Sequence, residues 1–363
     1  MIEALRPSYA LATCALALFI LGNVPFTSAS TKIEPKKEPT SKLIEAVKLK
    51  QNEQIPALLK NGSSVNERDE DLNTPLMWAA ESGNQEACNT LIEAGAYVTA
   101  RNIEGKTALM WAASKNRVDM IQLLLQAGAD VDEKNNSDET ALMMAANEGH
   151  IPALKALLNA KVDINAVDKL GWTALMWATS AGQIEVVKTL ILSGADVNSR
   201  VHYSGNTPLI EALHKEYPDM AGFLIESGAD VNVKTQAGWS PIKMATFMGY
   251  TEILRALLQS GANVNERDNQ GKTPLMWASI KGFTDIARIL IQAGADVYAS
   301  DNFGFTAWVL AKDGKQLGIL QVLRDAGVKD YKTMMVMKGT NGKVSLSRGF
   351  SWGSGGGFLS SVR

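Results

Sequence analysis

The chain has 363 residues, a formal net charge of −2 at pH 7 and 46% hydrophobic residues. The balanced charge argues against a basic nucleic-acid-binding protein, and the apolar content is that of a folded chain. Of its two cysteines, Cys14 and Cys88, only Cys88 would survive removal of the N-terminus, which argues against a disulfide-stapled extracellular domain. Cys88 stands where equivalent positions have isoleucine, leucine or valine, so we expect a buried, unreactive thiol.

The N-terminal segment has the composition of a leader followed by a tether. Residues 9–24 are nearly all apolar and small residues follow them, which predicts a secretory signal peptide over residues 1–29. The alternative is an uncleaved anchor formed by residues 9–24, although this stretch is short for a spanning helix. Residues 30–40 are polar with two prolines and predict a tether. We therefore expect the protein outside the cytoplasm, in the periplasm or secreted.

From residue 41 onward, one sequence phrase returns at intervals of 33 residues, with a single interval of 34. A fixed period in this range predicts a stack of structural repeats. The phrase opens with a threonine or serine suited to a helix N-cap, often followed by proline, which is tolerated at the first helical position. The opening residues are Thr74, Thr107, Thr140, Thr173, Thr207, Ser240, Thr273 and Thr306.

Each unit continues with a second apolar helix pattern and closes with Gly-Ala-Asp-Val or a close variant, as at Gly128 and Gly294. Helix, turn, helix and a turn-bearing loop in this length, with Thr-Pro-Leu and Gly-Ala-Asp-Val-Asn at these places, resembles the ankyrin repeat. The family usually has histidine after Thr-Pro-Leu, whereas methionine fills that place in most units here. The resemblance covers about residues 41–330 and implies an all-α solenoid of about nine units with β-hairpin-like connecting loops.

The units at the two ends differ from the others. Residues 41–66 keep both helices with a charged outer surface and predict an N-terminal capping repeat, and residues 67–330 predict eight ankyrin repeats, of which the last is a C-terminal cap. Residues 331–363 predict a flexible tail rich in glycine and serine, with a short strand over residues 343–346.

Two internal positions depart from the pattern. An extra residue precedes Thr207, and Glu216 and Tyr217 stand where a glycine is expected, so this most divergent unit is the expected point of flexure or specialised contact. Lys161 replaces the glycine at a helix end and costs about 1 kcal/mol if the site is left-handed.

The sequence offers no catalytic set, and we expect neither enzyme activity nor a cofactor. The three histidines, His150, His202 and His214, have no second ligand at metal-like spacing. The acidic run at residues 69–73 lacks the glycine and glutamate that a calcium loop needs, so no metal site is expected.

Aromatic residues recur in register. The set Trp78, Trp111, Trp177 and Trp277 on the first helices is expected to wedge into the core. The resemblance implies that Trp172, Trp239 and Phe305, just before the helix start, point into the concave face where ankyrin partners usually bind. Tryptophan is also enriched in interface hot spots. The candidate partner-binding residues are these seven together with Phe303, Asp69 and Asp71, the acidic pair marking the N-terminal end of the groove.

The expected function is a monomeric, non-enzymatic scaffold that binds a protein or peptide partner, of unknown identity, on its concave face. No nucleic acid is expected, and a membrane only through an uncleaved N-terminal segment. Two alternatives stay open at this point. One is a receptor for a small or glycan-like ligand on an aromatic shelf, and the other is an accessory or inhibitory subunit of a co-expressed enzyme.

Overall fold

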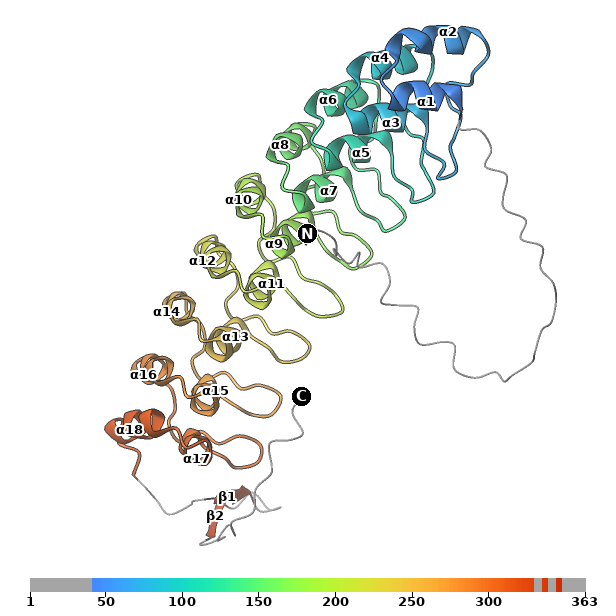
Figure 1. The fold of residues 1–363 in the computed structure, drawn as a ribbon. Helices are drawn as coiled ribbons and strands as arrows, with labels where there is room; N and C mark the ends of the chain where they lie inside the picture. The colour runs from blue at the N-terminus through green and yellow to red at the C-terminus, as the bar shows by residue number, and fades with distance from the viewer. Residues whose placement is uncertain (1–40, 330–334, 339–343, 348–363) are drawn as a thin grey trace, which may run out of the picture. The chain divides into compact units, whose positions relative to one another are not determined.

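A computed structural model of the chain describes residues 41–329, 335–338 and 344–347. The predicted signal peptide and tether (residues 1–40) and most of the predicted tail lie outside the described residues, so those assignments stay predictions. Within the described part, eighteen α-helices follow one another as nine helix–turn–helix pairs, stacked side by side (Figure 1).

The helices form two rows, one for each member of a pair (Figure 1). The first helices are α1 Lys42–Lys48, α3 Pro75–Ser82, α5 Ala108–Ser114, α7 Ala141–Asn147, α9 Ala174–Ser180, α11 Pro208–His214, α13 Pro241–Met248, α15 Pro274–Lys281 and α17 Ala307–Asp313. The second helices are α2 Ile55–Lys60 (after a short 3₁₀ turn, η1 Asn52–Gln54), α4 Gln85–Glu93, α6 Val118–Gln126, α8 Ile151–Asn159, α10 Ile184–Leu192, α12 Pro218–Glu226, α14 Thr251–Gln259, α16 Thr284–Gln292 and α18 Leu317–Asp325.

The first helices begin where the repeated threonine or serine predicted. In α5 the Thr107 side chain accepts a hydrogen bond from the backbone amide of Met110 at 3.4 Å, and it lies in extended backbone outside the helix. This bond satisfies one of the amides that a helix leaves unpaired at its N-terminus. Pro274 at the start of α15 has no amide to lose there, which confirms the second part of the expectation.

The core runs without interruption through the stack, between the two rows. Paired alanines such as Ala79 and Ala80 are fully buried where neighbouring first helices approach each other. Leucines of the second helices, such as Leu124 and Leu190, are also fully buried and fill the space between the rows. Cys88 lies in this same layer and is fully buried, as predicted from its register.

Helix ends adopt the left-handed backbone that the sequence pattern predicted. Lys161 has φ of +58° at the place where equivalent units have glycine, so the expected penalty of about 1 kcal/mol applies. Glu216, in the divergent unit, has φ of +62° for the same reason.

Beyond the solenoid, two strands, β1 Met335–Lys338 and β2 Val344–Ser347, pair antiparallel. The strand predicted over residues 343–346 is thus found one residue later. These eight residues pair as a two-stranded ladder, and the assignment of residues 331–363 as a flexible tail stays a prediction.

Candidate partner-binding surface

The loops that connect successive pairs project from the side of the first helices (Figure 1). We call the surface made by the first helices and these loop turns the concave face. Every residue that the sequence singled out for partner binding belongs to one of these elements. The question is therefore which of them are free to contact a partner and which serve the fold.

In three repeats, an aspartate at the start of the loop turn holds a tryptophan of the following helix. The Asp168 carboxylate accepts hydrogen bonds from the backbone amides of Leu170 (2.8 Å) and Trp172 (2.9 Å). Its other oxygen accepts from the indole Nε1 of Trp177 at 3.0 Å. One side chain thereby ties the turn to the helix and fixes the orientation of the indole.

The same arrangement joins Asp268 to Trp277 (2.9 Å) and Asp69 to Trp78 (2.8 Å). Asp69 also accepts from the backbone amide of Asn73 and lies 3.7 Å from the Lys48 ammonium. Its carboxylate is therefore already hydrogen-bonded within the chain, and partner binding by Asp69 stays a prediction.

Asp71 differs from Asp69 because its side chain is exposed and makes no hydrogen bond or ion pair in the described part of the chain. It remains a candidate acidic contact at the N-terminal end of the concave face.

The second repeat shows what happens without the aspartate. Asn102 stands at the start of that turn, and its amide nitrogen donates to the side-chain oxygen of Asn73 at 2.9 Å. Within the described residues, the indole Nε1 of Trp111 is buried and has no hydrogen-bond partner. The Lys106 ammonium lies 4.9 Å from the centre of the Trp111 ring, so a cation covers the face of this indole instead.

The expectation that Trp78, Trp111, Trp177 and Trp277 wedge into the core holds only in part: the first three pack against the core, but all four are half-buried and keep some exposed surface. The alanine pairs already fill the space between neighbouring first helices, and turn aspartates hold three of the four indoles toward the loops. Trp172, Trp239 and Phe305, which were expected to be exposed, are half-buried as well. The two sets thus belong to one surface rather than to a core and a shelf.

Direct ring contacts join the two sets. The ring centres of Trp172 and Trp177 are 5.3 Å apart. Farther along the stack, Trp239 stacks on Trp277 at 6.4 Å, and Phe247 packs edge-on against both, at 5.4 and 5.5 Å. These spacings are typical of favourable aromatic pairs. The sequence interpretation missed Phe247, since equivalent positions in other units are mostly polar.

A buried ion pair lies beneath the second cluster. Lys243, which replaces the usual methionine, donates to Asp268 at 2.9 Å, and the two side chains are only 8% and 3% exposed. Its ammonium lies 4.1 Å from the ring centre of Trp239 and 5.3 Å from that of Trp277. Burial raises the pKa of Asp268, but hydrogen bonds from Lys243, the Lys272 amide and Trp277, with the charge of Lys243, hold it below its usual value.

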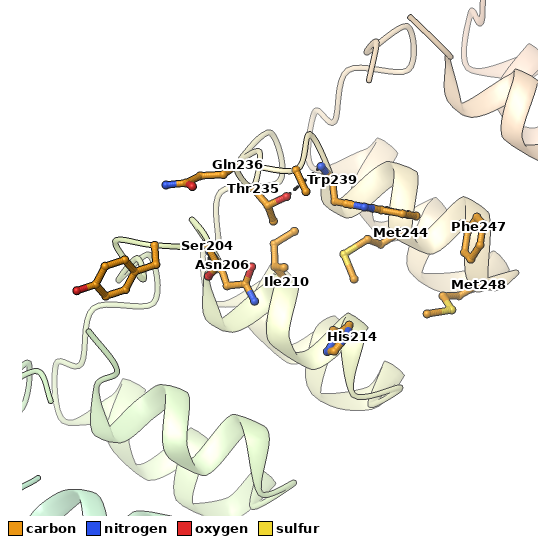
Figure 2. A pocket seen from close by; sticks show the side chains of 12 residues that line it. Ser204, Asn206, Ile210, His214, Thr235, Gln236, Trp239, Met244, Phe247 and Met248 are labelled. Atoms are coloured by element: carbon orange, nitrogen blue, oxygen red, sulfur yellow. Dashed lines mark hydrogen bonds between the residues drawn. The ribbon is translucent and has the colours of Figure 1, made fainter. Parts of the chain in front are cut away.

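The divergent unit borders a pocket of about 560 Å³ between α11 and α13 (Figure 2). Its walls are mainly apolar, and polar groups of the two preceding loops reach its edge. The residues that line it are Tyr203, Ser204, Asn206, Ile210, His214, Thr235, Gln236, Ala237, Trp239, Met244, Phe247 and Met248.

Two substitutions in the repeat pattern account for this pocket. Four residues after the N-cap, where α3, α5, α9 and α15 have tryptophan, α11 has Glu211 and α13 has Met244. Glu211 is buried and turns toward its own helix, 4.0 Å from the Lys215 ammonium. The indole that four other units have at this place is missing from α11 and α13, and the space opens beside Trp239.

Near the C-terminal end, Phe303 is 68% exposed at the tip of its loop. The Lys272 ammonium lies 5.7 Å from the centre of its ring and 3.3 Å from the Asp301 carboxylate. Phe305 is half-buried two residues later, and the backbone amides of both phenylalanines donate to Asp301. These rings supply further apolar surface on the concave face.

Comparison with protein-family models decides the classification. A model described as ankyrin repeats (3 copies) matches residues 43–135, 128–201, 209–301 and 243–332, and one described as ankyrin repeats (many copies) matches residues 180–225. The chain belongs to the ankyrin-repeat family. Ankyrin repeats generally mediate protein–protein interaction, and proteins built from them are typically non-enzymatic scaffolds. A search of curated proteins finds no significant match to the chain.

The histidines of this ankyrin-repeat protein do not gather into a site. The ring nitrogen Nε2 of His150 lies 3.1 Å from the Ser114 carbonyl, linking neighbouring repeats, whereas His202 and His214 are exposed. In the described ranges, no group of three or more histidine, cysteine, aspartate or glutamate side chains is arranged to hold a metal ion. No helix in the same ranges is long and apolar enough to span a bilayer.

Proposed function

We propose that this ankyrin-repeat protein is a non-enzymatic scaffold that binds a protein or peptide partner through its concave face, outside the cytoplasm. The aromatic cluster of Trp239, Phe247 and Trp277 supports the proposal most directly. Its rings are half-buried, in mutual contact, and accessible from the face that carries the loop turns. Large, half-exposed aromatic side chains are the commonest anchors of protein interfaces.

The anchoring of these rings favours binding. Trp177 and Trp277 are each held by a carboxylate of the preceding turn, so they lose little conformational freedom when a partner docks. The proposal of a location outside the cytoplasm rests on the apolar stretch at residues 9–24 alone.

The test is a pull-down from the native cell envelope with the wild-type protein and the variant Trp172→Ala/Trp239→Ala/Phe305→Ala. These three rings are suitable because none of their side chains holds a turn aspartate. Loss of the partner from a variant that keeps its helical circular dichroism supports binding on the concave face. A partner that survives the change moves the site elsewhere on the chain.

The matched control removes apolar surface from the second helices. Leu192 of α10 and Leu317 of α18 are 87% and 77% exposed, so Leu192→Ala/Leu317→Ala takes away comparable exposed carbon without touching the concave face. This variant is expected to retain the partner. Fractionation of the source cells tests the location of the protein separately. A protein found only in the cytosol would contradict the proposal that it is exported.

A further inference from the structure

We propose that the pocket between α11 and α13 receives one large apolar side chain from an extended segment of a protein partner, and that a carboxylate beside that side chain pairs with Lys281. This inference rests on the proposed function, since it names the chemistry that a partner must present at one place on the concave face. It predicts a recognition element of one aromatic residue followed closely by an acidic one.

The walls of the pocket suit an aromatic occupant. Ile210, Met244 and Met248 line it together with the rings of Trp239 and Phe247 (Figure 2). Its volume of about 560 Å³ lies within the range of sites that bury small ligands and exceeds what one side chain fills, so the occupant can enter with part of its backbone. The methionines adapt their flexible side chains to the shape of an entering ring.

The repeat pattern itself indicates a ring. In four other units, the place four residues after the N-cap holds an indole, and Trp177 at this place packs against Trp172. Next to Trp239, the corresponding places are taken by Glu211 and Met244. A partner's ring in this pocket would extend the row of contacts that joins Trp239, Phe247 and Trp277.

A cation next to Phe247, one of the rings that line the pocket, favours a carboxylate on the partner. Most lysines on this part of the concave face are already paired: Lys215 with Glu211, Lys243 with Asp268 and Lys272 with Asp301. Lys281 is the exception.

The Lys281 side chain is exposed, and its ammonium lies 3.7 Å from the centre of the Phe247 ring. No carboxylate of the residues that the structure describes lies within ion-pair distance of this ammonium. A side chain that enters beside Phe247 brings the following residues of its segment toward this cation, where an acidic group is favoured and a basic one is repelled.

The experiment uses three acetylated and amidated hexapeptides: Gly-Gly-Phe-Asp-Gly-Gly, the same peptide with lysine for aspartate, and the same peptide with alanine for phenylalanine. The readout is the indole N–H resonance of Trp239 in the ¹⁵N-labelled full chain, assigned with Trp239→Phe. We expect the first peptide to shift this resonance with a Kd about fivefold lower than that of the lysine peptide, because exposed ion pairs contribute modestly. The alanine peptide should produce no saturable shift.

Two variants connect the result to the pocket. Lys281→Gln is a surface change that should bring the aspartate and lysine peptides to the same affinity. Met244→Trp places in α13 the residue that four other units have at that position, so it should fold while filling part of the pocket and weakening the aspartate peptide by at least about tenfold. A Met244→Trp protein that binds as the wild type does would overturn the proposal.

Other occupants have distinct outcomes. If 3-phenylpropionate alone binds as tightly as the aspartate peptide, the pocket is a small-molecule site and the proposal of a peptide occupant is wrong. If peptide binding emerges only in the variant Phe350→Ala/Trp352→Ala/Phe358→Ala, the chain's own C-terminal segment occupies the pocket, and the proposal is again overturned. If the peptides do not bind and the protein still captures its partner in the pull-down, this inference is wrong, but the proposed function stands.

Discussion

Replacing each partner of the buried ion pair Lys243–Asp268 in turn gives the sharpest test of how the aromatic surface is held in place. The two partners are not equivalent. Asp268 also accepts hydrogen bonds from the Trp277 indole and from the backbone amides of Gln270 and Lys272. The Lys243 ammonium has the Asp268 carboxylate as its anion and lies over the rings of Trp239 and Trp277.

The magnitudes follow from this asymmetry. Asp268→Asn leaves an ammonium that is almost fully buried without its anion, and we expect a loss of about 3–5 kcal/mol in the free energy of unfolding. Lys243→Met restores the usual residue of the repeat and leaves Asp268 with three hydrogen bonds, as Asp168 has without any lysine, so we expect a loss of only about 1–2 kcal/mol. The double variant should be close to Lys243→Met, since neither charge remains.

The assay is urea unfolding followed by circular dichroism at pH 7 and at a series of lower pH values. Because the folded pKa of Asp268 lies below its ordinary value of 3.8, its contribution to stability is fully present above about pH 4 and is lost as the pH falls through the folded pKa. Removal of Lys243 should reduce this acid-dependent loss. An Asp268→Asn protein that is no less stable than Lys243→Met would refute the reasoning.

Three further predictions concern single side chains. Lys161→Gly should raise the free energy of unfolding by about 1 kcal/mol, because Lys161 has φ of +58°. Gly194→Ala should lower the free energy of unfolding by a similar amount, although no atom lies within 4 Å of the added carbon. An unchanged urea midpoint for Lys161→Gly would contradict this reasoning. Trp177→Phe removes the indole donor from Asp168 and should lower the free energy of unfolding by about 1.5–3 kcal/mol. The Trp172 indole donates no hydrogen bond in the described part of the chain, so Trp172→Phe should lower it clearly less in the same measurement. Burial raises the pKa of Cys88 to about 12, so at pH 8 an aromatic disulfide reagent should label this thiol only after unfolding, and rapid labelling of the folded chain would show that the repeat opens locally.

The sequence by itself determined the architecture, because the features that specify an ankyrin unit are local. The bond from the Thr107 side chain to the Met110 amide joins residues three apart, and the backbone at Lys161 is dictated by the end of its own helix. Such interactions recur with every period and can be recognised without knowing what lies beside them. The match of the ankyrin family models to most of the chain confirms this part of the interpretation.

One signal in the sequence was missed. Each tryptophan that a turn holds by its indole stands nine residues after an aspartate, as in Asp168 and Trp177, whereas Trp111 follows an asparagine at the same spacing. This pattern would have placed those indoles near the loops rather than in the core.

Only the tertiary structure decided how the side chains of different repeats combine. Trp239 stacks on Trp277, and Phe247 packs against both, although they belong to separate units of the chain. The pocket beside them depends on Glu211 turning back toward its own helix. Contacts of this kind depend on the distance and rotation between stacked repeats. A residue's position within one repeat does not predict that geometry.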